Sequence, residues 1–221
     1  MMISNKKRLN TALALNLLIV VFDSYALFMA FFSDKGGFKW QFLQYFCHIA
    51  NILAVLSSLY AAFVIMAERE HPRGNKATYP ARLSAFVTTT CLIFSFIITV
   101  CVLVPLDSFG KGRLYLLSSY FFFEHLVCPI LAFLTISVFG DYRRFGNGEA
   151  LTAVIPIAAY AAVMFLLNIL KVMDAPFYFF SVYTQSWYVS VMWFIGLIAL
   201  AYGAAWLLIF LARKIKVAEV A

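Results

Sequence analysis

Charged residues are scarce in this chain. Asp, Glu, Lys and Arg together make up 12% of its 221 residues, and only ten residues are acidic. Hydrophobic residues make up 64% of the sequence, and a soluble domain of this size has too little interior to bury them. The composition therefore excludes an ordinary soluble enzyme or binding domain and indicates a polytopic membrane protein.

Several functional motifs are also missing. The four cysteines, Cys47, Cys91, Cys101 and Cys128, all fall in apolar segments and form no Cys-x-x-Cys pair, which argues against a secreted disulfide framework or a structural zinc module. The chain has no internal repeat, no glycine-rich phosphate loop and no Gly-x-Ser-x-Gly motif. Chemistry in this protein must therefore come from residues inside the apolar segments.

The apolar residues come in blocks long enough to cross a bilayer. A helix rises about 1.5 Å per residue, so about 20 residues cross a hydrocarbon core of about 30 Å. We predict an all-α membrane protein in which a single domain, residues 1–221, forms one bundle of six transmembrane helices. The predicted spans run over residues 9–32, 38–67, 81–104, 114–139, 150–171 and 186–212.

The distribution of Lys and Arg predicts the orientation of the bundle. With six spans, twelve basic residues fall at the end that carries both termini and five at the opposite end. The positive-inside rule then places both termini in the cytoplasm, and we expect the protein in the plasma membrane of a bacterium. The net charge of +7 needs no nucleic acid, because the basic residues lie next to span ends, where they contact lipid head groups.

A layer of ionisable residues interrupts two of the spans. Cys47 and His48 follow the start of the second span, and His125 follows the start of the fourth. Cys47 would lie about 14 Å from the outer end of its helix and His125 about 16 Å from the outer end of its own. Because such groups are costly in hydrocarbon, their common depth predicts a functional site.

Helical spacing extends this layer. Gln44, Cys47 and Asn51 share one face of the second span, and His48 lies at the edge of that face. A stripe of this kind must face other helices or a wet cavity rather than lipid.

The fourth and first spans add candidate residues at the same depth. His125 and Cys128 share a face, and Pro129 removes the backbone bond to the His125 carbonyl, which predicts a kink there. Asp23 is a candidate to orient or charge-balance a histidine. Glu124 projects about 100° away from His125 and could meet another helix or an interfacial group. Each of these residues could also be a packing or helix-linking residue.

Two sequence motifs resemble those of a known family. Residues 44–56 (QYFCHIANILAVL) resemble the second-span motif Tyr-Phe-Thr-x-x-x-Asn-x-Leu of the androgen-induced-protein family and its bacterial six-helix relatives. Residues 120–134 (YFFFEHLVCPILAFL) resemble the partner motif, a histidine followed by an apolar pair, Pro and a Leu-rich run.

This resemblance implies an intramembrane hydrolase of fatty-acid esters that uses a Thr nucleophile and a His. The His corresponds to His125, and Cys47 stands where the family has Thr. We therefore expect Cys47 and His125 to form a nucleophile–base pair for hydrolysis or acyl transfer, with a membrane lipid as substrate and no cofactor. Asn51, Gln44 or His48 would donate to the oxyanion, and Asp23 and Cys128 would support the site.

Other interpretations remain open. The polar layer could be a non-catalytic cavity that binds a lipid or small solute. A metal site of His48, His125, Cys47 and Cys128 is disfavoured because neighbouring Cys47 and His48 should diverge on a helix, and haem between the two histidines has no supporting motif. An ion channel would need polar faces along several spans, whereas the sequence suggests polarity at one level. The oligomeric state cannot be predicted.

Overall fold

The computed structural model describes residues 2–32, 38–70, 78–106, 119–139, 142 and 144–218. These residues form helices and connecting segments, with no strand among them. The elements are α1 (Met2–Phe32), the 3-10 helix η1 (Trp40–Gln44), α2 (Phe46–Glu70), α3 (Thr78–Ile97), the π-helical η2 (Ile98–Leu103), α4 (Val104–Leu106), α6 (Ser119–Phe122), the π-helical η3 (Phe123–Val127), α7 (Cys128–Phe139), α8 (Asn147–Ile169), the 3-10 helix η4 (Tyr178–Phe180) and α9 (Trp187–Ala218).

Six of the helical stretches are long and apolar enough to cross a membrane, which confirms the predicted class of the fold. They cover Lys7–Phe32, Phe46–Glu70, Thr78–Leu103, Tyr120–Ser137, Asn147–Ile169 and Trp187–Lys214. The predicted start of the fourth span, residue 114, lies outside the described residues. Among the span ends that the structure describes, the largest departure is in the second span, which was expected to start at residue 38. Tyr45 has an extended backbone that separates η1 from α2, so the membrane-length helix begins at Phe46. Cys47 is therefore in the first turn of this helix, and the predicted distance of about 14 Å from its outer end is wrong.

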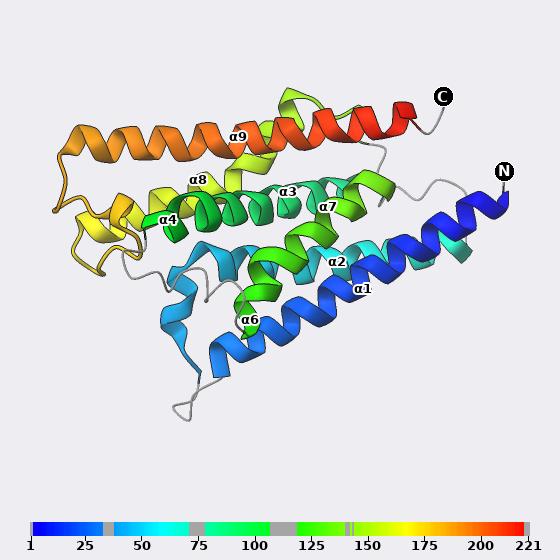
Figure 1. The fold of residues 1–221 in the computed structure, drawn as a ribbon, viewed down its shortest axis with the longest axis horizontal. Helices are drawn as coiled ribbons and strands as arrows, with labels where there is room; N and C mark the ends of the chain where they lie inside the picture. Colours follow the sequence, from blue (N-terminus) through cyan, green and yellow to red (C-terminus); the bar gives the residue numbers. More distant parts are fainter. Residues whose placement is uncertain are drawn as a thin grey trace.

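The helices are arranged around a central pair (Figure 1). α3 and α7 lie in the middle of the bundle, α1 and α2 pack together on one side, and α8 and α9 pack together on the other. The N-terminal end of α1 and the C-terminal end of α9 lie at the same end of the molecule, as six crossings require (Figure 1). Buried alanines such as Ala50, Ala54, Ala153 and Ala201 let the helix backbones approach closely.

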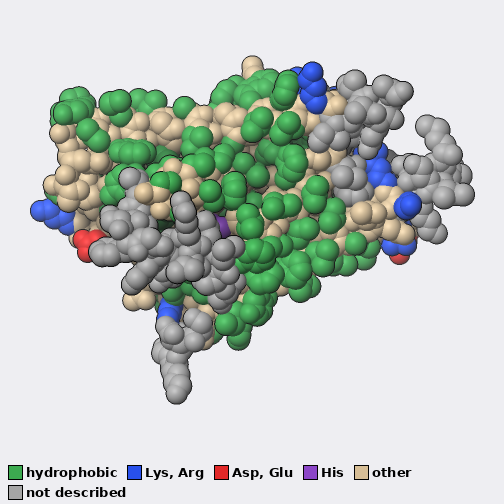
Figure 2. Space-filling model, in the orientation of Figure 1, with side chains coloured by type: hydrophobic (Ala, Val, Ile, Leu, Met, Phe, Trp, Pro, Cys, Tyr) green, Lys and Arg blue, Asp and Glu red, His purple; other side chains and the backbone are tan. Residues whose placement is uncertain are grey.

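The outer surface is suited to lipid. Large apolar side chains are exposed on the outward faces of the helices, including Phe28, Phe63, Ile155 and Met192. In the face shown in Figure 2, hydrophobic side chains cover the middle of the molecule, and the Lys, Arg, Asp and Glu side chains lie toward its two ends. Length, hydropathy and surface together indicate an integral membrane protein.

Two π-helical segments interrupt the inner helices. η2 continues α3 and is followed by Pro105, and η3 separates α6 from α7 and is followed by Pro129. A proline has no N–H to donate to the carbonyl four residues earlier, which for Pro129 is the carbonyl of His125. The helix widens at the position where the sequence predicted a kink. Single π turns of this kind are frequent at functional sites.

Candidate functional site

A cavity of about 380 Å³ lies between the two π segments, the start of α2, and α8. Its wall is mostly aromatic and aliphatic, with residues from η1, η4 and α8 among them. Apart from the tyrosines, the polar side chains on this wall come from three regions of the chain: Cys47 and His48, Ser95 and Thr99, and His125. The cavity therefore has the volume and lining of a small-ligand pocket, with a few convergent polar groups.

His48 is held in place by a carboxylate and by aromatic rings. Its Nδ1 lies 3.0 Å from Oε1 of Glu124, and both side chains are almost completely buried. The rings of Phe31 and Phe42 lie 5.7 and 5.4 Å from the imidazole, measured between centroids. When Glu124 is ionised, its oxygen accepts the Nδ1 proton, which leaves Nε2 with a free lone pair.

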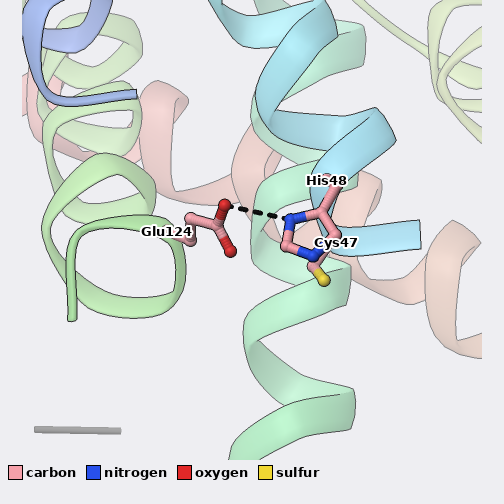
Figure 3. A group of neighbouring side chains, drawn as sticks. All are labelled: Cys47, His48 and Glu124. Atoms are coloured by element: carbon pink, nitrogen blue, oxygen red, sulfur yellow. Dashed lines mark hydrogen bonds and ion pairs between the residues drawn. The ribbon is translucent and has the colours of Figure 1, made fainter. Parts of the chain in front are cut away.

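Cys47 completes a compact group with these two residues (Figure 3). One donor atom from each of Cys47, His48 and Glu124 lies within 4.8 Å of the other two. In Figure 3, Nδ1 points toward Glu124, and the Cys47 sulfur lies beside the opposite edge of the imidazole ring. The expectation that Cys47 and His48 diverge is thus corrected. Both residues belong to the first turn of α2, just after the extended Tyr45, where their side chains can turn toward each other.

His125 lies on another wall of the same cavity. It belongs to η3, is 4% exposed, and its Nδ1 lies 3.4 Å from the Thr99 hydroxyl of η2. The Phe121 ring stacks on the imidazole, with 6.0 Å between centroids. His125 is also close enough to His48 for their charges to interact. The two π segments thus place a hydrogen-bonded imidazole against the space next to Cys47.

Of the supporting residues predicted from the sequence, His48 is on the cavity wall, whereas Asn51, Gln44, Asp23 and Cys128 lie outside the lining. Asn51 is fully buried, and its amide donates to the Cys47 carbonyl at 2.8 Å. Gln44 ends η1, and its carbonyl accepts a hydrogen bond of 2.6 Å from the Tyr160 hydroxyl. This bond joins α8 to the chain just before the break at Tyr45.

Asp23 and Cys128 form a second buried contact. Asp23 is completely buried on α1, and the Cys128 thiol lies beside its carboxyl. Asp23 is also close enough to Glu124 for their charges to interact. Among the described residues, neither Asp23 oxygen meets a donor at hydrogen-bonding geometry, and the same holds for Oδ1 of Asn51 and Oε2 of Glu124. Buried acceptors of this kind are costly unless protons, water or a cation satisfy them.

Glu124, Thr99 and Ser95 belong to this region although the predicted site did not include them. The sequence left open whether Glu124 meets another helix or an interfacial group, and the structure places it against His48 of α2. An acidic residue inside an apolar span was the signal that could have marked it as a site residue. Thr99 and Ser95 carry no such signal, because hydroxyls in membrane helices commonly donate to their own backbone.

No family model, curated protein or solved structure matches this chain. What the site can do must therefore be argued from its own chemistry. A thiol beside an imidazole that is oriented by a carboxylate is the arrangement of an activated nucleophile. Thiolate, imidazole and carboxylate are also ligands of zinc-type ions.

Proposed function

We propose that this protein is an intramembrane enzyme that hydrolyses a lipid ester or transfers its acyl group, with Cys47 as the nucleophile. The observation that carries the proposal is the cluster of Cys47, His48 and Glu124, whose donor atoms lie within 4.8 Å of one another, with Cys47 and His48 on the wall of an apolar cavity. In this group the nucleophile lies beside a base, and a third residue orients the base. The apolar lining suits a substrate with an acyl chain.

The first half of the reaction forms a thioester. The Cys47 proton moves to Nε2 of His48, and the sulfur attacks the ester carbonyl carbon. The resulting oxyanion intermediate collapses, the carbon–oxygen bond of the ester breaks, and the alcohol leaves with the proton that His48 held. In the second half, His48 takes a proton from water or an acceptor alcohol, whose oxygen then displaces the sulfur. The products are an acid or a new ester, and the Cys47 thiol is regenerated.

Two kinds of group are suited to stabilise the negative charges of this reaction. Cys47 lies in the first turn of α2, where the helix dipole favours negative charge. His125, on another wall of the cavity, can donate from its ring. We assign to His125 the stabilisation of the oxyanion, and to His48 the role of base, since His48 is in the group with the thiol and with the carboxylate that orients it. A well-placed donor of this kind contributes about 3 kcal/mol.

We also propose a distant relationship to the androgen-induced-protein family. The support is that its two motifs, around Cys47 and His125, meet at one cavity. A Cys in the position of the family's Thr keeps nucleophilic catalysis possible, because a thiolate is the stronger nucleophile. It also favours a thioester intermediate, from which the acyl group can pass to acceptors other than water.

We further propose that the bundle lies in a bacterial plasma membrane with both termini in the cytoplasm. The orientation is supported by the distribution of Lys and Arg. With six spans, twelve basic residues fall at the end of the bundle that carries both termini, and five fall at the opposite end. An epitope inserted after Asp174, between α8 and α9, should then be labelled in intact spheroplasts. An epitope at the C-terminus should be labelled only after the cells are permeabilised, and the opposite pattern would overturn the orientation.

The catalytic proposal is tested by intact-protein mass spectrometry after incubation with a long-chain p-nitrophenyl ester. We expect the wild-type protein to gain the mass of one acyl group, and neutral hydroxylamine to remove it, as it does a thioester. The Cys47→Ala variant should gain no mass. Cys101→Ala is the matched control, because Cys101 is the exposed cysteine of η2, and it should be acylated like the wild type.

The outcomes separate catalysis from binding. If the folded wild-type protein forms no adduct and turns over no ester, the cavity is a binding site for a lipid or small solute and the catalytic proposal fails. Acylation that persists in Cys47→Ala would place the reactive group elsewhere and would equally reject the proposed mechanism.

A further inference from the structure

The group of Cys47, His48 and Glu124 has a second chemical property that the acyl-transfer mechanism does not use. It places one sulfur, one imidazole nitrogen and one carboxylate oxygen within 4.8 Å of one another. His48 and Glu124 are 2% and 1% exposed, so two of the three residues are almost completely shielded from solvent. Three different metal-ligating side chains in one buried cluster are uncommon inside a membrane span.

The separations are close to those of a metal site. Zinc lies about 2.3 Å from a thiolate sulfur and about 2.0–2.2 Å from an imidazole nitrogen or a carboxylate oxygen, so ligand atoms in a tetrahedral site lie roughly 3.3–3.7 Å apart. Donor atoms within 4.8 Å need to close by only about an ångström. Rotations of the Cys47 and Glu124 side chains can supply a movement of this size.

A buried Glu124 oxygen without a hydrogen-bond partner is independent support for a metal site. Oε2 of Glu124 is buried without a hydrogen-bond partner among the described residues, while Oε1 contacts His48. A buried carboxylate oxygen without a partner is costly, and a cation bound there would satisfy it. Cys47 contributes a free thiol that can lose its proton on coordination.

We propose that Cys47, His48 and Glu124 bind a divalent transition-metal ion of the zinc type, with the fourth coordination position directed at the cavity. Cys47 and His48 are part of the cavity wall, so an ion held between them is accessible from that space. A mixed sulfur, nitrogen and oxygen set selects zinc-type ions over calcium and magnesium, which prefer oxygen ligands alone. Three protein ligands with one open position form a site that can exchange its fourth ligand.

The metal site has a consequence for the proposed function, and this part of the inference rests on that function. An ion bound to Cys47, Glu124 and the ring nitrogen that faces Glu124, Nδ1 of His48, holds the sulfur as a coordinated thiolate and leaves the imidazole proton on Nε2, so neither the nucleophile nor the base is free. Zinc would therefore act as a reversible inhibitor of acyl transfer, and removal of the ion would restore the free thiol and imidazole. The site would respond to the availability of the metal.

The test uses the full chain without a histidine tag, stripped with a chelator and dialysed against Zn²⁺ in detergent. We expect one zinc ion per wild-type chain, and a Co²⁺-loaded sample should show a thiolate-to-cobalt absorption band. Cys47→Ala, His48→Ala and Glu124→Gln should each weaken binding by at least about tenfold. Cys101→Ala, which removes an exposed thiol outside the cluster, should bind zinc like the wild type.

Absence of zinc binding in a folded wild-type sample would overturn the metal site, as would binding that Cys47→Ala leaves unchanged. The Glu124→Gln variant keeps the shape of the side chain, so a loss of binding there with an unchanged elution profile reports ligation rather than unfolding. If zinc binds but no acyl adduct ever forms without it, the metal site stands and the catalytic proposal fails. If the adduct forms and zinc neither binds nor blocks it, the catalytic proposal stands and the metal site fails.

Discussion

Replacing His48 by Gln is expected to slow acylation of Cys47 by about 100-fold to 10,000-fold, the usual contribution of a general base. A Gln amide can still donate to Glu124, so the contact between α2 and η3 can persist, but it cannot take a proton from the thiol. The loss should appear in the acylation rate rather than in lipid binding. It is measured by following the acyl adduct over time at saturating ester.

His125→Gln is the matched comparison. His125 shares the cavity with Cys47 but lies outside the group that Cys47, His48 and Glu124 form. A donor to the oxyanion can be replaced in part by an amide, so we expect a smaller loss than for His48→Gln. If His125→Gln lowers the acylation rate more than His48→Gln does, the two roles are reversed and His125 is the base.

Replacing His48 by Ala is expected to lower the free energy of unfolding by about 3–5 kcal/mol, because it leaves the Glu124 carboxylate buried without its partner. Both side chains are almost completely buried and their 3.0 Å contact links α2 to η3. Thermal or denaturant unfolding in detergent measures this loss. A loss below about 1 kcal/mol would mean that the buried pair does not form.

A double variant distinguishes the stability effect of the His48–Glu124 pair from that of the packing around it. His48→Phe combined with Glu124→Leu keeps an apolar side chain at each position and removes both polar groups. Replacing a whole buried pair in this way is often neutral or stabilising, so the double variant should be more stable than His48→Ala. If the double variant is as unstable as the single one, the loss reflects packing around Phe31 and Phe42 rather than an unpaired charge.

The sequence was sufficient to predict the six membrane-length helices, because hydropathy over about 20 residues is a strong signal. The rarity of ionisable residues in such segments also pointed to Cys47, His48 and His125 as a predicted site, and the structure places all three on the wall of one cavity. Helix ends were less predictable. The break at Tyr45 depends on η1 and on the Tyr160 hydrogen bond to Gln44, and a hydropathy window does not detect either.

The partners of the site residues could not be predicted for a related reason. Periodicity within one helix tells which residues share a face, but it does not tell which face of another helix they meet. Glu124 and His48 are 76 positions apart, and their contact depends on how η3 is wound and packed against α2. The π turn of η3 shifts the residues around it relative to a regular α-helix, which a 3.6-residue period cannot anticipate.

The first turn of α2 supplies both the thiol and the imidazole from consecutive residues. Their relative position is therefore set by local backbone geometry, and it does not depend on how distant helices happen to be spaced at a given moment. From other parts of the chain, Glu124 of η3 hydrogen-bonds the imidazole and Phe31 of α1 packs against it. Changes in lipid thickness or lateral pressure that separate α2 from η3 would thus leave the thiol and the imidazole side by side and move the carboxylate that orients the imidazole. On the proposed mechanism, the bilayer would then tune the rate of the reaction in a graded manner.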